Sequence, residues 1–419
     1  MNHHMLLLLM YRWRMRRHLM INRIEERNDV NNDDAIIAFI LGKMENFVYS
    51  RNRKIFYKTL SLEERRRRGR KIPRESLEHP SRSAWRKLYE SGNDAALITL
   101  TGLDHVTFDE LNIKFKLLFD SHTPHTVNGT IEILAHCAGS RGRPRLIQSH
   151  DCLGLCLAWT RTRGSCYVLQ LIFGMTGTAL SLYIRFGRRL LITVLHHDVN
   201  AAVKLPSAEK IATMKQAVAE RHPQLVDVWC TMDGLKLYLE QSPWTVIQNM
   251  FYNGWTHDHY VGNVIVFCPD GTIPIACTNV PGCVHDSMIA EWGNIYDKLG
   301  EVFNSCGGKC IVDSAFCKLK YDYLIKSAQS APENTVEFVV NEQATAMRQS
   351  AEWGMRALQA SFPRIKDHFM YEEREERKLI LKMIVLLYNS RANKVGINQI
   401  RNTYMPALSQ CGNVFVPDA

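Results

Sequence analysis

The feature that most constrains the fold is the run "LVDVWCTMDGLK", residues 225 to 236, in which apolar residues alternate before Asp233 and Gly234. Alternation with a period of two predicts a strand, here residues 225 to 232. Asp-Gly after a strand usually predicts a hairpin turn. The clearer hairpin comes later, in "VIVFCPDGTIPIAC", where Asp270 lies between two predicted strands. Asp233 therefore needs another reason for its place at a strand end.

From about residue 94 the pattern is helical, and the strand signals begin at residue 225. Ser207 is a credible N-cap for a helix that Pro223 stops. "KCIVDSAF" predicts a short buried strand that ends at Asp313. Further strands are predicted at about 260 to 268 and 272 to 278, and further helices over "HDSMIAEWGNIYDKL", about 341 to 362 and about 371 to 389.

Composition limits the class of protein. A chain of 419 residues with 46% hydrophobic content is long enough for two or three globular domains. No stretch approaches the roughly 18 consecutive apolar residues of a spanning helix, so we expect no membrane role. We also expect no secretion signal and, for the 12 cysteines, free thiols in a reducing compartment.

The positive charge is concentrated at one end. Residues 1 to 92 hold 21 Lys+Arg against 11 Asp+Glu, which leaves +10, whereas residues 93 to 419 hold 31 of each. Arginine-rich runs suit phosphate binding or nuclear import, although a solvated, disordered tail explains them equally well. The predicted DNA-binding residues of this arm are Arg65, Arg66, Arg67, Arg68, Arg70 and Lys71.

A helix-turn-helix is a candidate at residues 163 to 195. Two helical patterns meet there around Gly174 and Gly177. If the second helix enters the major groove, Arg185, Arg188 and Arg189 contact DNA. Ordinary helical packing is the alternative, because any two short helices joined at glycine look similar.

Three acids can share one site in this scheme. Asp233 and Asp313 end predicted strands, and Glu352 borders the apolar face of the helix at 341 to 362. The helix can bring Glu352 to the rim of the sheet. A solvated ion-pair ladder with Arg348 and Arg356, four residues away on either side, explains Glu352 without catalysis.

Converging carboxylates favour a hard divalent cation, because the cation offsets their mutual repulsion. Two magnesium ions at such a site would align an attacking oxygen against a phosphodiester. Zinc is the competing metal, since histidines and cysteines cluster between residues 257 and 317. No pair of them has the CxxC spacing of a zinc knuckle.

Four blocks, "MDG", "PGCVHDSMI", "IVDSAF" and "AEWGMRALQASFPRIK", resemble in this order the DDE-type endonuclease domain of PIF/Harbinger transposases and Harbinger-derived nucleases. The resemblance covers roughly residues 94 to 395. It implies an α/β, RNase H-like fold and a triad that binds two divalent ions, Mg²⁺ or Mn²⁺. The triad falls on Asp233, Asp313 and Glu352. His285 and Asp286 match a block with a supporting role, although Asp286 could instead be a helix N-cap.

The resemblance also implies a function and partners. We expect a nuclease or transposase that cuts double-stranded DNA at transposon ends and integrates into a short A/T-rich target. A Myb-like accessory protein, a homo-oligomer and a nuclear location, with the cytoplasm as a second site, are further expectations. "MDGLKLYLE" lacks a histidine often found after the first acid, and the last block reads "EWGMRAL" where many members have arginine and phenylalanine around the glutamate.

Two other functions stay open: a catalytically inactive, transposase-derived DNA-binding protein, and a zinc-stabilised interaction module. The expected organisation is a basic arm at 1 to 92, a helical domain at 93 to 205, an RNase H-like domain at 206 to 395 and a tail at 396 to 419.

Overall fold

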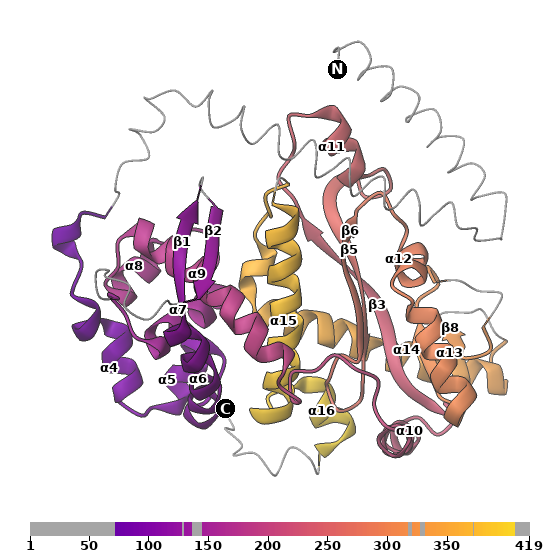
Figure 1. Ribbon diagram of the computed structural model, residues 1–419. Helices are drawn as coiled ribbons and strands as arrows, with labels where there is room; N and C mark the ends of the chain where they lie inside the picture. Colours follow the sequence, from indigo (N-terminus) through magenta and orange to yellow (C-terminus); the bar gives the residue numbers. More distant parts are fainter. Residues whose placement is uncertain are drawn as a thin grey trace. The chain divides into compact units, whose positions relative to one another are not determined.

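The structure is a computed structural model that describes residues 72–127, 130–135, 145–316, 321–326, 332–371 and 373–406. Residues Gly69–Ala419 form one compact unit. Its first part is mainly helical and its second part holds a mixed sheet between helices, with α9 of the first part packed against α15 of the second (Figure 1). The expected α/β class is confirmed.

The helical part packs around buried aromatic side chains. Trp85 is 1% exposed and stacks on Phe173 with ring centroids 5.3 Å apart. The predicted arm at 1 to 92 is therefore wrong for residues 72 to 92, which fold into this core; the arm up to residue 71 lies outside the described residues. The elements are η1 (Arg74–Ser76), η2 (Pro80–Arg82), α4 (Ala84–Glu90), α5 (Asp94–Thr101), α6 (His105–Ser121), β1 (His122–Val127), β2 (Thr130–Ala135), α7 (Ser149–Arg161), α8 (Tyr167–Phe173) and α9 (Gly177–His196).

The second part contains a six-stranded mixed sheet that curls in Figure 1. Its strands are β3 (Val228–Tyr238), β4 (Tyr252–Asn253), β5 (Asp258–Phe267), β6 (Ile275–Pro281), β7 (Lys309–Val312) and β8 (Leu324–Lys326). β5 pairs antiparallel with β3, β4 and β6, whereas β7 pairs parallel with β3 and β8. This mixed sheet flanked by helices is consistent with the RNase H-like fold expected from the sequence.

Helices cover both faces of this sheet. One face packs on α10 (Ala208–Arg221), α12 (Asp286–Trp292) and α13 (Ile295–Cys306), and Cys230 and Met232 of β3 lie in that core. On the other face lie α14 (Val336–Ser361) and α15 (Arg374–Lys394), where Thr231 and Ser350 of α14 share a 3.2 Å hydrogen bond. The smaller elements are α11 (Thr245–Phe251), η3 (Pro363–Lys366) and α16 (Gln399–Tyr404).

Three predicted boundaries of strands and helices differ from the structure. β3 runs through Asp233 and Gly234 without a turn, because β5 pairs with it as far as Tyr238. Asp233 is therefore inside a strand rather than at its end. The single helix expected over "HDSMIAEWGNIYDKL" is α12 and α13, separated where Asn294 adopts φ 50. The helix expected from residue 341 begins at Val336, N-capped by Thr335.

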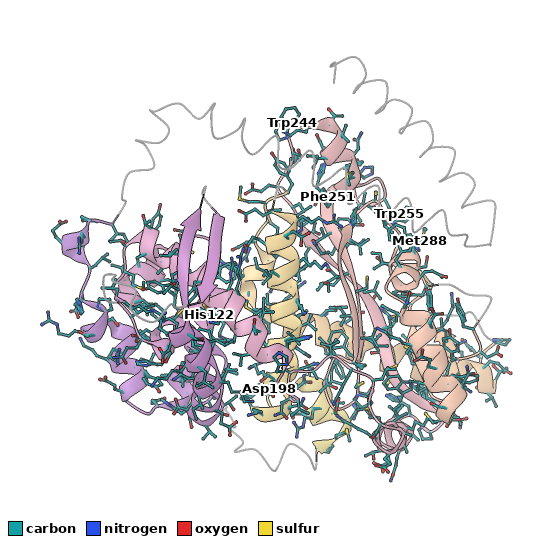
Figure 2. The ribbon with its side chains drawn as sticks, viewed as in Figure 1. His122, Asp198, Trp244, Phe251, Trp255 and Met288 are labelled. Carbon is teal, nitrogen blue, oxygen red and sulfur yellow. The ribbon has the colours of Figure 1, made fainter. Side chains whose placement is uncertain are left out.

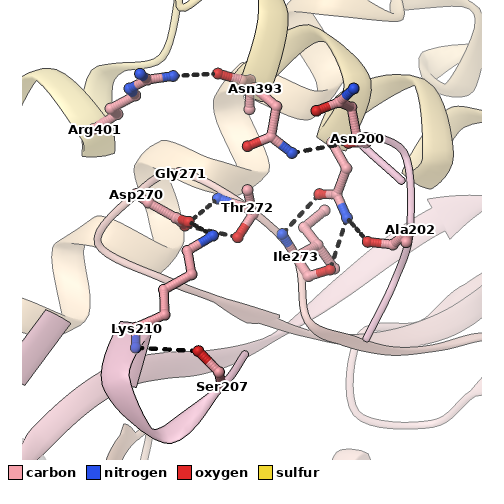
Figure 3. A network of polar contacts seen from close by, with 12 residues as sticks. Asn200, Ala202, Ser207, Lys210, Asp270, Gly271, Thr272, Ile273, Asn393 and Arg401 are labelled. Carbon is pink, nitrogen blue, oxygen red and sulfur yellow. Dashed lines mark hydrogen bonds and ion pairs between the residues drawn. The ribbon is translucent and has the colours of Figure 1, made fainter. Parts of the chain in front are cut away.

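The turn predicted at Asp270 is confirmed, and it is buried. Gly271 has φ 81, a left-handed conformation that suits glycine. The Asp270 carboxylate accepts hydrogen bonds from the backbone and hydroxyl of Thr272 and pairs with Lys210 of α10 at 2.6 Å (Figure 3). Asn389 of α15 hydrogen-bonds the backbone just after the turn. Helices from both faces therefore fix this corner of the sheet.

α8 and α9 meet at an angle of 88°, and Gly174 ends α8 with φ 63. Within the described residues no single helix is long and apolar enough to cross a membrane, whereas this bent pair reaches that length and composition only when its two helices are taken together.

Candidate active site

Two predicted acids meet where β7 leaves the sheet. Met232 and Val312 form the last pair between β3 and β7, so Asp233 is the next residue of β3 and Asp313 is the first residue after β7. Side chains alternate along a strand, and Met232 and Val312 belong to the core on the α12 side. Asp233 therefore lies on the opposite face, toward α14. The parallel register brings Asp313 out of the sheet beside it.

The Asp233 carboxylate is largely buried, with its side chain 21% exposed. Burial raises its pKa to about 6, because water no longer stabilises the charged form. The charges of Asp313 and Asp286 also raise the pKa, whereas Arg348 and the Gly234 backbone N–H, 2.7 Å from Oδ1, lower it. Three carboxylates thus influence one another at this point of the sheet.

Asp286 reaches the same point from α12 on the other face. It is the first residue of α12, but the N-cap is His285, whose side chain accepts a hydrogen bond from Ser287 N. The alternative that Asp286 is the N-cap is therefore wrong. A Cβ added to Gly234 would lie 2.5 Å from Asp286 Oδ2, so the absence of a side chain at Gly234 lets the carboxylate approach. Burial raises the pKa of Asp286 as well.

Glu352 joins the site through an arginine. Arg348, one turn earlier on α14, is 3.0 Å from Glu352 Oε1 and 3.8 Å from Asp233 Oδ2. Arg356, with its side chain 77% exposed, is 3.8 Å from Glu352 Oε2. The ion-pair ladder foreseen for Glu352 is thus present. Arg348 in addition links the helix to the sheet, which the spacing of Arg348 and Glu352 along α14 could not reveal.

The oxygen donors suit a hard divalent cation only in part. Asp233 and Asp313 are adjacent and can share one ion, whereas Glu352 is engaged by two arginines. In the part of the chain that the structure describes, no three histidine, cysteine, aspartate or glutamate side chains lie close enough to hold a metal. Glu352 would have to leave Arg348 to complete the triad.

The described residues also contain no cluster of histidine and cysteine side chains that could hold zinc. Cys283 is exposed and His285 caps α12, whereas Cys310 lies in the core beside Cys230 of the neighbouring strand. No disulfide joins two of the described cysteines.

The arginines proposed for groove binding lie beside α15. Arg188 is 6% exposed, pairs with Glu376 at 2.9 Å and stacks on the Trp159 ring. Arg189 pairs with the same glutamate at 3.3 Å, and Arg185 lies 3.9 Å from Glu373. These contacts favour ordinary helical packing for α9. Arg65, Arg66, Arg67, Arg68, Arg70 and Lys71 lie outside the described residues.

Comparison with known proteins agrees with this geometry. Residues 232–389 match the family model of the DDE superfamily endonuclease, and this span includes Asp233, Asp286, Asp313 and Glu352. No curated protein and no solved structure matches the chain. The segment that forms the carboxylate site is therefore similar to the DDE superfamily endonuclease, and this similarity supports its placement in the DDE nuclease and transposase superfamily.

Proposed function

We propose that this protein is a metal-dependent DNA endonuclease of the PIF/Harbinger transposase type, which cuts phosphodiester bonds at transposon ends and joins them to a short A/T-rich target. The observation that carries the proposal is the pairing of β3 with β7, which makes Asp233 and Asp313 neighbours within the span similar to DDE endonucleases.

Each residue has a distinct part in this proposal. Two bound Mg²⁺ or Mn²⁺ ions would activate the attacking oxygen and stabilise the leaving oxygen. Asp233 and Asp313 hold the cations from the sheet, and Glu352 supplies the third carboxylate once it separates from Arg348. Asp233, with a pKa of about 6, is mostly ionised at neutral pH. Asp286 adds negative charge behind Gly234, with His285 fixing the start of its helix.

The partners follow from the same proposal. Double-stranded DNA is the substrate, and the basic segment before residue 72 supplies affinity for its phosphates. A Myb-like accessory protein, a homo-oligomer and a nuclear location complete the proposal.

A second candidate is a catalytically inactive DNA-binding protein of the same descent. The observation that favours it is the pairing of Glu352 with Arg348 and Arg356, which neutralises the third acid. The two candidates differ in whether a divalent ion draws Glu352 away from these arginines.

Nicking of a supercoiled plasmid or a transposon-end duplex with magnesium or manganese tests the proposal. Asp233→Asn, Asp313→Asn and Glu352→Gln should each abolish cutting and leave the protein folded. Asp297→Asn, an exposed acid on α13, is the control and should cut like the parent. A triple variant that cuts as well as the parent contradicts the site. DNA binding without cutting under any metal favours the inactive candidate.

A further inference from the structure

Trp255 is 92% exposed, more than any other large hydrophobic side chain in the described residues. It lies at the tip of the hairpin formed by β4 and β5, where Tyr252 pairs with His259 and Asn253 with Asp258. Single exposed apolar residues are common on protein surfaces. A fully exposed indole, however, leaves both ring faces in water and available for stacking.

Hydrogen bonds within the tip define the conformation of its turn. The Asn253 side-chain oxygen accepts hydrogen bonds from the backbone N–H groups of Trp255, at 3.0 Å, and Thr256, at 3.1 Å. The Tyr252 hydroxyl and His257 Nδ1 lie 3.1 Å apart across the base of the turn. Trp255 is thus presented on a preorganised backbone, so a ligand that stacks on it orders little chain.

The hairpin is tied to the carboxylate site. Asn253 Nδ2 donates a hydrogen bond to the Gly282 carbonyl at 2.8 Å, and Asp286 follows four residues later at the start of α12. Asp286 in turn lies over Gly234, next to Asp233. Trp255 and Met288 of α12 are labelled in Figure 2. The tip therefore continues the strand that pairs with β3 at the acids: Ile265, opposite Asp233, lies seven residues, roughly 23 Å, along β5 from Asp258.

The chemistry of the surface selects the kind of ligand. Residues 244 to 257, "WTVIQNMFYNGWTH", contain no Lys, Arg, Asp or Glu, and the nearest charged residue after them is Asp258 at the base of the hairpin, so the tip itself offers a flat aromatic surface. Lys236 lies on the same face of β3 as Gly234, is exposed, and is 5.4 Å from the Tyr260 ring centroid. Lys236 is opposite Gly262, four residues along β5 from Asp258 at the base of the turn, so a single strand of several nucleotides can place one base on the indole and a phosphate further along near the lysine.

We propose that Trp255 is a stacking platform for an unpaired nucleobase of the DNA strand that enters the carboxylate site. A base inside a duplex is already stacked on both faces, so the indole gains contact only with a base that is single-stranded or flipped out. This inference rests on DNA being the substrate under the proposed function. It adds that Trp255 contacts the DNA and that the contacted base is unpaired.

The test compares affinities for a fluorescent single-stranded oligonucleotide and its duplex, measured with the full chain by anisotropy. Base stacking on an aromatic side chain is worth about 1–3 kcal/mol, which corresponds to roughly 5- to 150-fold in affinity. Trp255→Ala should weaken single-strand binding by about that factor and duplex binding less. Trp255→Phe should retain most of the affinity. Trp244→Ala, 45% exposed on the same segment, is the matched control and should bind like the parent.

Tryptophan emission gives a second readout, since stacking should quench a component that Trp255→Phe lacks. Equal single-strand affinity for Trp255→Ala and the parent overturns the inference and leaves a protein partner as the occupant of the tip. A parent that binds no DNA overturns both proposals. Because binding requires no cutting, loss of nicking in a protein that keeps Trp255-dependent binding contradicts the endonuclease proposal alone.

Discussion

The carboxylate of Asp286 lies directly over Gly234, so close that a Cβ at Gly234 would be 2.5 Å from Asp286 Oδ2. The glycine after Asp233 is therefore explained by a close approach between α12 and β3 and not by a turn, because β3 continues through it to Tyr238. One missing side chain lets an acid from the opposite face of the sheet approach Asp233.

Gly234→Ala should displace Asp286 and destabilise the protein. Insertion of a methyl group into a packed site costs about 1–3 kcal/mol. Urea denaturation measures the change in unfolding free energy, and nicking assays measure the effect on the site. Gly254→Ala is the control, since a Cβ at Gly254 meets nothing within 4 Å. Equal stability of the two variants would show that Asp286 moves away at no cost.

Arg348→Gln should raise the affinity for Mg²⁺ and Mn²⁺ several-fold. Arg348 places a positive charge between Asp233 and Glu352, where it competes with a cation for the same oxygens. Isothermal titration with MnCl₂ measures the affinity. Arg356→Gln is the matched control, because Arg356 is exposed, contacts Glu352 only at 3.8 Å and has no recorded ion pair with Asp233. Weaker metal binding by Arg348→Gln would mean that the arginine positions the acids instead.

The stability of the metal-free protein should fall as pH rises through the range in which Asp233 loses its proton. Its pKa is about 6 in the folded protein against an ordinary 3.8, so the folded state binds the proton more tightly. The resulting stabilisation is present below pH 4 and is lost by about pH 6, and two pKa units correspond to about 2–3 kcal/mol. Asp233→Asn should therefore become more stable than the parent as pH rises from 4 to 7.

Thermal unfolding in EDTA at several pH values measures this difference. The unfolding temperature of Asp297→Asn, a variant at an exposed position on α13, should change with pH in the same way as that of the parent. A constant gap between Asp233→Asn and the parent over this range would contradict the raised pKa.

Deletion of residues 1–71 should weaken DNA binding and flatten its salt dependence. This segment holds 17 Lys+Arg and 8 Asp+Glu, a net charge of +9, and contacts to phosphates release counterions. The deletion ends before Trp85. Trp85 is buried in the helical core, so a deletion that extended to residue 92 would destabilise the protein. The slope of log affinity against log salt concentration measures whether residues 1–71 contact phosphates. An unchanged slope would mean that the phosphate contacts come from residues 72–419. Imaging of the truncated protein tests nuclear import separately.

Much of the chain could be predicted from local pattern. Ser207 caps α10, Asp270 forms the turn between β5 and β6, and "KCIV" forms the short buried strand β7 before Asp313. Each depends on residues close in sequence, such as an N-cap side chain or the alternation of a strand. The segment that matches the DDE family model also lies within the span identified from its sequence blocks.

Tertiary structure alone decided what surrounds the acids. The length of β3 depends on pairing with β5, whose residues lie about 30 positions away, so local pattern ended the strand at residue 232 instead of Tyr238. The Arg348 contact with Asp233 and the Asp286 approach to Gly234 join segments separated by 115 and 52 positions. The burial of Arg188 against Trp159 and Glu376 likewise depends on helix packing. Sequence by itself determined which residues carry charge, whereas packing determined which charges meet, because desolvation and Coulomb interaction depend on distances that only the folded chain sets.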